Sequence, residues 1–424
     1  MMSPFVRLCL VGFLFDFAIM AAITVMPFYV YNQLGGGAAM SGAFGGVQAA
    51  AYALTCLVSS RFVQRSRYGL RWAYTGMILF MALVPALAWN RSPWLCGAQG
   101  AAGFGSLALV WPAFYSWLGA DPDPARRQRR LGWFNICWSA GFAVSPLVAG
   151  PLYDLDFRLA FLLVLGVSFA ALALLWTIPR EEDYFGSRAM PDDDTSDDPN
   201  SDARHAALSE AYLVAAWMAI CLANVLVGGL RNVYPKHFET LFQSDGIRLI
   251  FDVPVPALLQ GGAATELSVM FSLLSCATSA CFLLFGATRF WKHRLWVLLG
   301  LELAAAAGLS LLIRTGSLVV MTVTFVCCGA FVGGAFFSSV YYGIADPRHK
   351  HRRSAINEGV VGLGGLIGSF GFGALAEWLG MTAALDAAVP LTVCCMAVQI
   401  WITRRALKRV VGGDVTRPEV VKQL

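Results

Sequence analysis

Long runs of apolar residues, separated by short polar segments, extend along most of this chain of 424 residues. A helix of about 20 apolar residues crosses the roughly 30 Å hydrocarbon core of a bilayer, and backbone groups inside lipid must be paired within such a helix or within a closed barrel. The runs therefore predict membrane-spanning helices rather than strands. The first run is too long, and too polar at its end, for a cleaved signal peptide. Twelve runs are long enough, at residues 5–31, 38–60, 70–89, 94–119, 131–153, 157–178, 208–234, 264–287, 294–313, 317–344, 354–378 and 381–403.

The composition excludes an ordinary soluble enzyme. Hydrophobic residues make up 58% of the chain and charged residues 13%, against about 25% charged residues in soluble domains. The 11 cysteines lie inside the apolar runs and the 5 histidines lie outside them, so neither type suggests a disulfide framework or a metal site. The sequence shows no phosphate-binding loop, zinc motif, nucleophile elbow or nucleic-acid module. We expect an integral membrane protein that is not an enzyme, with no cofactor, no metal and no nucleic-acid partner.

Basic residues are distributed unevenly between the two sides of the predicted membrane. If both termini lie in the cytoplasm, 25 of the 31 Lys and Arg residues fall on the cytoplasmic side and 6 on the outer side. Membrane proteins carry such an excess of positive charge in their cytoplasmic loops. We therefore expect an even number of spans with both termini cytoplasmic, in the plasma (inner) membrane.

A polar segment at 179–207 divides the runs into two groups of six. It holds 9 of the 26 acidic residues, together with Pro191 and Pro199, a composition typical of a flexible linker. A partner-binding site is the alternative interpretation. We expect four regions: an N-terminal six-helix bundle at 1–178, this acidic cytoplasmic linker, a C-terminal six-helix bundle at 208–403, and a basic cytoplasmic tail at 404–424 near anionic headgroups.

The two groups of six resemble each other in order. Asp16 and Pro27 in the first run correspond to Asn224 and Pro235 in the seventh, both at an offset of 208 residues. Parallel six-helix repeats place a substrate site between the halves, near the midplane of the membrane. The predicted fold is therefore all-α, with 12 transmembrane helices in two parallel six-helix repeats. Further correspondences, at an offset of 223, join Arg129 and Arg130 with Arg352 and Arg353, Gly141 with Gly364, Gly150 with Gly373, and Asp154 with Glu377.

Three local motifs accompany this architecture. The loop between the second and third runs contains Gln64-Arg65, followed by Gly69 and Arg71. The fourth run begins with Cys96-x-x-Gln99-Gly100. The fifth run contains Gly141-x-x-x-Ser145-Pro146-x-x-Ala149-Gly150, a pattern of small residues around a proline that suits close helix packing.

The spans, the charged central segment and these motifs together resemble the major facilitator superfamily over nearly the whole chain. Gln64 stands where the family usually has an Asp, and Cys96 stands where it usually has an Arg. The pattern in the fifth run is similar to that of family antiporters. The resemblance implies a secondary active transporter of a small solute that works by alternating access, with a slight preference for export. The two lost motif residues leave an alternative: a transport-inactive, transporter-like sensor or assembly partner.

Asp16, near the middle of the first run, is the candidate for proton coupling. An ionisable side chain in the bilayer costs roughly 2.5–3.5 kcal/mol on insertion scales, so its presence calls for a reason. Gly12, Met20, Thr24 and Pro27 share its helical face, and the resemblance implies that this span lines a cavity. The alternative is a carboxylate satisfied by a neighbouring helix.

Several other polar and aromatic residues within the spans are candidates for lining the substrate cavity. Arg231, near the outer end of the seventh run, suits an anionic substrate group, an outer gate, or simple contact with the headgroups. Small polar stripes are also typical of helix packing, and aromatic residues are also typical of the lipid interface. The cavity candidates are Gln48, Tyr52, Gln99, Trp111, Tyr115, Asn135, Trp138, Asn224 and Arg231.

Glu358, in the inner third of the eleventh run, is a candidate for an inner gate. We expect it to pair with an arginine near the cytoplasmic surface, and Arg65 and Arg130 are the candidates. Glu302, in the middle of the ninth run, suggests either a structural hydrogen bond or a partner contact. We expect a monomer whose partners are the lipid bilayer and a small-molecule substrate of unknown identity.

Overall fold

The computed structural model describes residues 2–63, 69–121, 123–179, 184, 199–245, 262–344 and 350–412. Nearly all of them lie in helices, which follow the predicted apolar runs. The elements in chain order are α1 (Pro4–Asn32), α2 (Ala38–Val63), α3 (Gly69–Leu83), η1 (Pro85–Trp89), α4 (Pro93–Gly105), η2 (Ser106–Leu109), α5 (Val110–Gly119), α6 (Pro124–Leu155), α7 (Phe157–Leu175), α9 (Pro199–Asn232), α10 (Tyr234–Asp245), α11 (Ala263–Ala287), α12 (Leu295–Leu312), α13 (Leu318–Ile344), α14 (Lys350–Leu379), α15 (Met381–Asp386) and α16 (Ala388–Gly412).

Eleven helices among the described residues are long and apolar enough to cross a membrane. The predicted fourth span is not among these eleven, because it is divided into α4, the 3-10 helix η2 and α5. At the break, the Ser106 hydroxyl lies 2.7 Å from the carbonyl oxygen of Gly103 and 2.9 Å from that of Gly76 on α3. The helical membrane fold predicted from the sequence is confirmed, with its fourth span divided at η2.

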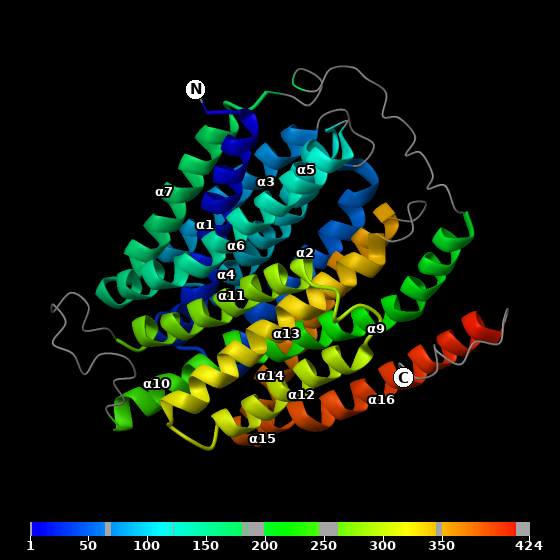
Figure 1. Ribbon diagram of the computed structural model, residues 1–424. Helices are drawn as coiled ribbons and strands as arrows, with labels where there is room; N and C mark the ends of the chain where they lie inside the picture. The colour runs from blue at the N-terminus through cyan, green and yellow to red at the C-terminus, as the bar shows by residue number, and fades with distance from the viewer. Residues whose placement is uncertain are drawn as a thin grey trace.

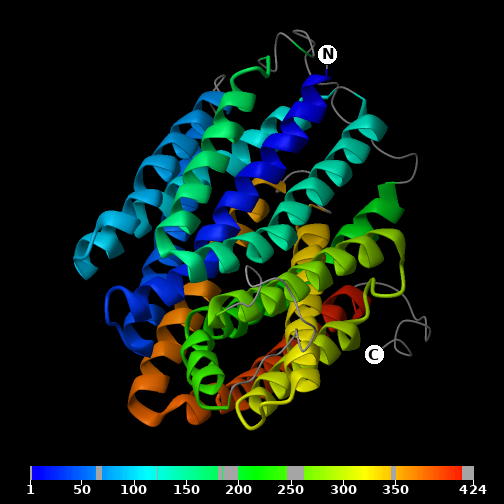
Figure 2. The ribbon, with the colours of Figure 1, turned by 90° about the vertical axis from the view of Figure 1, so that its left-hand side faces the viewer.

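The helices form two groups that lie side by side, one from each half of the chain (Figures 1 and 2). In the first group α1 packs along α6 and α7, and α2 packs along α4. In the second group α9 packs along α13, α14 and α16, and α11 packs along α13. The exact bounds of the two bundles stay predictions, and most of the linker at 179–207 lies outside the described residues.

Consecutive spans run in opposite directions, so that α1 begins and α16 ends at the same end of the bundle. We call this end the terminal end and the opposite one the distal end. At the terminal end, Arg7 donates a hydrogen bond to the carbonyl oxygen of Thr177, just after α7. At the distal end, the Tyr29 hydroxyl donates to the carbonyl oxygen of Leu87 in η1, at 2.7 Å.

The two halves are in close contact at the distal end, where α2 packs on α14 and α6 packs on α11. Gly42 on α2 lies at a close approach of the two halves: a Cβ there would lie 2.2 Å from the carbonyl oxygen of Ser369 on α14, so that only glycine fits. At the contact of α6 with α11, the Ser272 hydroxyl on α11 donates to the carbonyl oxygen of Ala143 on α6, at 2.7 Å. These contacts close the distal side of the interface between the halves.

Candidate functional site

A cavity of about 370 Å³ lies between the two halves. The first half lines it with α1, α2, the interrupted fourth span and α6, and the second half with α9, α11, α13 and α14. Among the described residues, α3, α7, α12 and α16 contribute nothing to the lining. Its volume falls within the range of about 300–1,000 Å³ that is typical of small-molecule sites.

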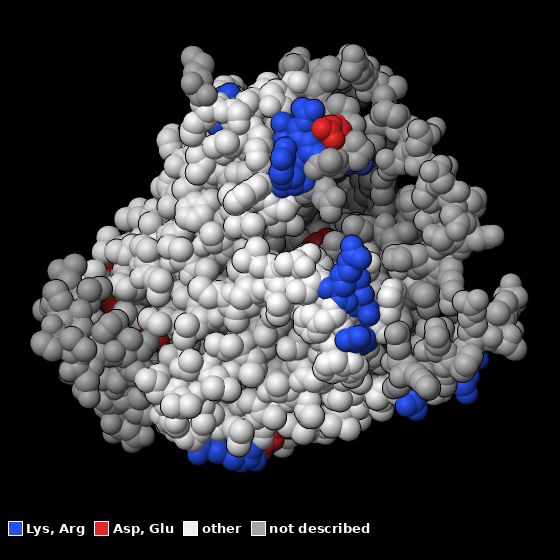
Figure 3. Space-filling view, in the orientation of Figure 1, with Lys and Arg blue, Asp and Glu red and all other residues white. Residues whose placement is uncertain are grey.

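The surface of the molecule is hollowed between two groups of basic side chains (Figure 3). The described basic residues near the terminal end include Arg126 and Arg129 at the start of α6, and Arg289 and Lys292 between α11 and α12. Because the distal side is closed by helix contacts, the hollow indicates a conformation whose interface is open towards the terminal end.

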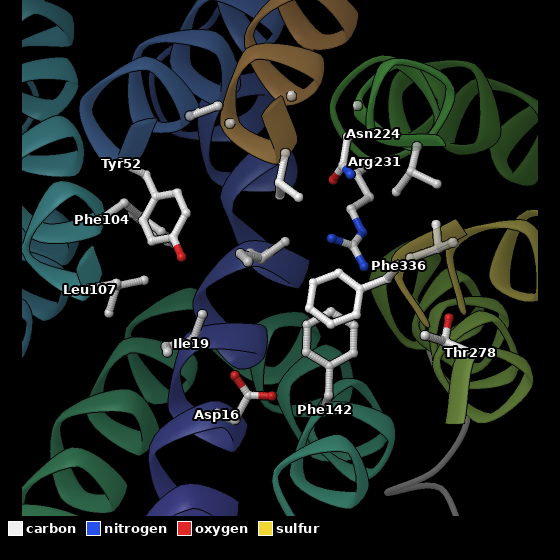
Figure 4. A pocket seen from close by; sticks show the side chains of 18 of the residues that line it. Asp16, Ile19, Tyr52, Phe104, Leu107, Phe142, Asn224, Arg231, Thr278 and Phe336 are labelled. Atoms are coloured by element: carbon white, nitrogen blue, oxygen red, sulfur yellow. The ribbon is translucent and has the colours of Figure 1, made fainter. Parts of the chain in front are cut away.

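Two opposite charges point into the cavity from different halves, Asp16 from α1 and Arg231 from α9 (Figure 4). Asp16 is 5% exposed, and its Oδ2 is buried without a hydrogen-bond partner. The buried Nε of Arg231 also has no hydrogen-bond partner, and the guanidinium carbon lies 5.1 Å from the centre of the Phe142 ring. Both groups therefore keep unused hydrogen-bonding capacity at the cavity.

A second acid of the cavity, Glu358 on α14, is already engaged. Its Oε2 accepts a hydrogen bond of 2.7 Å from the Tyr52 hydroxyl on α2, which joins the two halves. Gln48 lies one helical turn before Tyr52 and also lines the cavity, where its Nε2 is buried without a partner. In this conformation Glu358 is thus a cavity residue, and its pairing with an arginine at the terminal end stays a prediction for another conformation.

Aromatic side chains form much of the remaining wall. Trp111 and Trp138 have ring centres 6.3 Å apart, and Trp138 lies 5.9 Å from Phe282 on α11. Asn135 lies outside the lining, where its Oδ1 accepts from Trp138 Nε1 at 3.0 Å and from the Tyr115 hydroxyl at 3.4 Å. Asn135 therefore orients two residues of the wall.

The remaining predicted site residues have different positions. Asn224 lines the cavity, while its Nδ2 donates to the carbonyl oxygen of Ile220 at 2.9 Å. Gln99 lies outside the lining and accepts from Asn90 Nδ2 at 2.9 Å. Of the two inner-gate arginines, Arg130 is the one that lies among the described residues. Arg130 pairs with Asp121 at 2.6 Å, and the side chain of Arg65 lies outside the described residues.

Several lining residues were not predicted from the sequence. The sequence gives no sign that three of them, Phe142, Phe282 and Phe336, line the cavity. An aromatic residue in an apolar helix looks the same in the sequence whether it faces lipid, core or cavity. Ser275 and Ser279 belong to a visible polar stripe on α11 and line the cavity. Among the described residues, no group of three or more His, Cys, Asp or Glu side chains is arranged to hold a metal ion.

Comparisons with known proteins agree with this architecture. The sequence model of the Major Facilitator Superfamily matches residues 8–251. A search of curated protein sequences gave no match. Several solved transporter structures share the fold over nearly the whole chain.

One of them is a bacterial homologue of the human lysosomal transporter Spinster, in an inward-facing and occupied conformation, with 15% identity, a TM-score of 0.66, and coverage of 99% of this chain and 100% of that chain. A POT family transporter in complex with 5-aminolevulinic acid has 11% identity, a TM-score of 0.73, and coverage of 95% and 96%. The nucleoside transporter NupG has 12% identity, a TM-score of 0.69, and coverage of 95% and 99%. At these identities the likeness concerns the fold alone. With the family model matching more than half of the sequence, the chain belongs to the Major Facilitator Superfamily.

Proposed function

We propose that this secondary transporter moves a small solute by alternating access and couples the movement to protons through Asp16. The observation that carries the proposal is the position of Asp16: a carboxyl group with a partnerless oxygen in the cavity between the two halves. Removal of water favours a neutral carboxyl group and hydration favours the carboxylate. A carboxyl group that is alternately enclosed and hydrated therefore takes up and releases a proton in each transport cycle.

The charge distribution supports an orientation with both termini in the cytoplasm of a cell bounded by the plasma (inner) membrane. In that orientation the terminal end is the inner end. The closed distal contacts, such as Gly42 against Ser369, then lie on the outer side. The conformation of this structure then faces inward. Since one chain encloses the whole cavity, we propose that the monomer is the working unit.

The packing of α6 supports export in exchange for protons. A Cβ at Gly141 would lie 2.2 Å from the carbonyl oxygen of Phe13, and one at Gly150 would lie 2.7 Å from that of Ala264. The glycines of the antiporter-like pattern therefore sit where α6 meets both its own half and the other half. This arrangement supports a shared design with family antiporters, in which proton and solute use the cavity in turn.

Transport into proteoliposomes with an imposed pH gradient tests the proposal. We expect radiolabelled candidate solutes to accumulate against their gradient, and a trapped pH-sensitive dye to report the matching proton movement. Asp16→Asn keeps the size and hydrogen bonding of the side chain but cannot titrate, so it should abolish uphill accumulation and leave counterflow exchange partly intact.

The matched control is Asp386→Asn, because Asp386 pairs with Arg314 at 2.6 Å outside the cavity. Uphill transport by Asp16→Asn at the wild-type rate would refute the role of Asp16. A folded protein that moves neither protons nor any candidate solute would instead favour a transport-inactive sensor.

A further inference from the structure

We propose that the cavity binds an amphipathic zwitterion: a cationic amine at Asp16, an anionic group at Arg231, and an apolar body against the aromatic wall. The inference rests on the proposed transport function and names the chemical class of the solute. It follows from three features of the cavity, which are its unpaired charges, its apolar wall and the placement of the charges on different halves.

The first feature is the pair of unused charged groups. Asp16 Oδ2 and Arg231 Nε are both buried and both lack a hydrogen-bond partner, and the structure shows no ion pair between the two side chains. A buried charge without a partner is unfavourable, and it is retained only where something compensates it. Asp16 and Arg231 attract each other across the cavity without direct contact, so a ligand with only an amine leaves Arg231 without a direct partner, and one with only an acid leaves Asp16 without one. A zwitterion satisfies both.

The other ionisable groups of the lining do not change this balance. Glu358 accepts the hydroxyl of Tyr52, and Tyr115 contacts Asn135. The lining contains no lysine or histidine, and Arg231 is its one cation among the described residues. The anionic group of a ligand therefore has a single cationic anchor, while Asp16 is the acid whose oxygen remains available.

The second feature is the wall between these groups. Figure 4 shows Phe142 and Phe336 next to the guanidinium of Arg231, and Trp111, Trp138 and Phe282 continue the wall on the same cavity. Aromatic faces bury apolar surface and attract the cationic edge of a ligand. The body of the zwitterion is therefore apolar or aromatic, and the cavity of about 370 Å³ limits it to a small molecule.

The third feature is the placement of the two anchors. Asp16 belongs to the first half and Arg231 to the second, so a zwitterion that contacts both connects the halves. A proton on Asp16 removes the negative charge that attracts the amine. Proton and zwitterion therefore exclude each other at this carboxyl group, which is the condition for exchange of one for the other.

Ligand binding to the purified full-length protein in detergent tests the inference. Each probe set shares one apolar body: phenylalanine, phenethylamine and 3-phenylpropionate; tryptophan, tryptamine and indole-3-propionate; leucine, 3-methylbutylamine and 4-methylpentanoate. Phenylalanyl-phenylalanine adds a zwitterion with more widely separated charges. Dissociation constants follow from ligand-dependent thermal stabilisation. For at least one body, we expect the zwitterion to bind about tenfold or more tightly than its amine and its acid.

Two variants test which ligand group each of Asp16 and Arg231 binds. Asp16→Asn should weaken zwitterion binding roughly 30-fold without weakening binding of the acid-only probe, whereas Arg231→Gln should weaken zwitterion binding similarly without weakening binding of the amine-only probe. Asp386→Asn and Arg314→Gln are matched controls outside the cavity, and Asp16→Glu should restore part of the affinity. The unfolding temperature without ligand shows whether each variant is folded.

The inference is overturned if an amine or acid alone binds as tightly as its zwitterion, or if no zwitterion in the set binds. Binding in detergent needs no gradient, so it fails independently of proton coupling. Zwitterion binding without Asp16-dependent uphill transport would refute the coupling and keep the solute class. Asp16-dependent transport of a simple cation or anion would refute the zwitterion as the solute class and keep the proton coupling.

Discussion

The carboxylate of Asp154, at the end of α6, accepts two hydrogen bonds from Thr265 near the start of α11, one from its backbone N–H at 2.7 Å and one from its hydroxyl at 2.6 Å. The first N–H groups of a helix lack partners within the helix, and the helix dipole favours an acid there. Gly262, the residue before α11, has no side chain to cap it. A residue of the first half therefore caps a helix of the second half.

The same arrangement recurs in the corresponding place of the other half. Glu377, at the end of α14, accepts from the backbone N–H of Ala39 at the start of α2, at 3.4 Å. The repeat that relates Asp154 to Glu377 in the sequence thus relates two helix caps in the structure. Both caps join the halves at the distal end, so both must break when that end opens.

Removal of the Asp154 cap, whose hydrogen bonds are the shorter, should favour opening of the distal end. Asp154→Ala leaves the start of α11 uncapped, at a cost of about 1 kcal/mol to the closed form, which corresponds to about a fivefold shift in population. Spin labels at the exposed Leu155 and Ser317, in a cysteine-free background, report the distance between the halves. Asp386→Ala, which breaks a pair within one half, is the control. Equal distance distributions for Asp154→Ala and the control would contradict this account.

A single methyl group at Gly42 should hold the distal end apart. The Cβ of alanine at this position would lie 2.2 Å from the carbonyl oxygen of Ser369, and a backbone atom yields less than a flexible side chain. We expect Gly42→Ala to increase labelling of a cysteine at Ser41, which is 1% exposed, by a membrane-impermeant maleimide. Gly371→Ala, where a Cβ meets nothing within 4 Å, should leave the labelling unchanged. Equal labelling in the two variants would rule out Gly42 as the contact that permits closure.

Glu302 should act as a structural residue rather than a transport residue. Gln399 Nε2 on α16 donates to Glu302 Oε1 on α12 at 2.8 Å, and both side chains are fully buried away from the cavity. We expect Glu302→Gln to preserve transport and to leave the unfolding temperature near that of wild type. Gln399→Leu removes the donor and should destabilise the fold by about 1–3 kcal/mol. Loss of transport in a stable Glu302→Gln variant would show that this acid has a further role.

Glu358 should exchange partners when the terminal end closes. The carboxylate that accepts from Tyr52 in this conformation is expected to pair with an arginine such as Arg65 in an outward-open state. Cysteines at 358 and 65 should then cross-link in outward-open protein and not in inward-facing protein. Glu358→Lys, which replaces attraction by repulsion, should disfavour the outward-open state. An outward-open structure with Glu358 facing lipid or the outer cavity would disprove this exchange.

Both termini and the 179–207 segment should lie in the cytoplasm. The expectation depends on the 25 basic residues assigned to that side against 6 on the other. A single cysteine at residue 195 should resist impermeant reagents in intact cells and react after permeabilisation. Labelling of residue 195 in intact cells would invert the orientation and, with it, the assignment of the inward-facing conformation.

Sequence alone located the spans, because apolar length has a direct physical relation to bilayer thickness, but it did not predict the break at η2 in the fourth span. It also singled out Asp16 and Arg231, since a charge inside an apolar run is conspicuous. It could not find Phe142 as a neighbour of Arg231, because the direction of an apolar side chain depends on tertiary packing. The pairing of Glu302 with Gln399 was hidden for the same reason: 97 residues separate them and no periodicity links them.

The 3-10 segment η2 sets the orientation of α5 independently of α4. A residue turns the chain by about 100° in an α-helix and by about 120° in a 3-10 helix, so the four residues of η2 rotate everything after them by roughly 80° relative to an unbroken helix. Gln99 before the break meets Asn90, while Trp111 and Tyr115 after it line the cavity. If each residue of this span is substituted in turn, the positions that affect transport should follow one helical pattern before η2 and a rotated helical pattern after it. A residue inserted into or deleted from η2 would redirect the aromatic face of α5 while α4 kept its place.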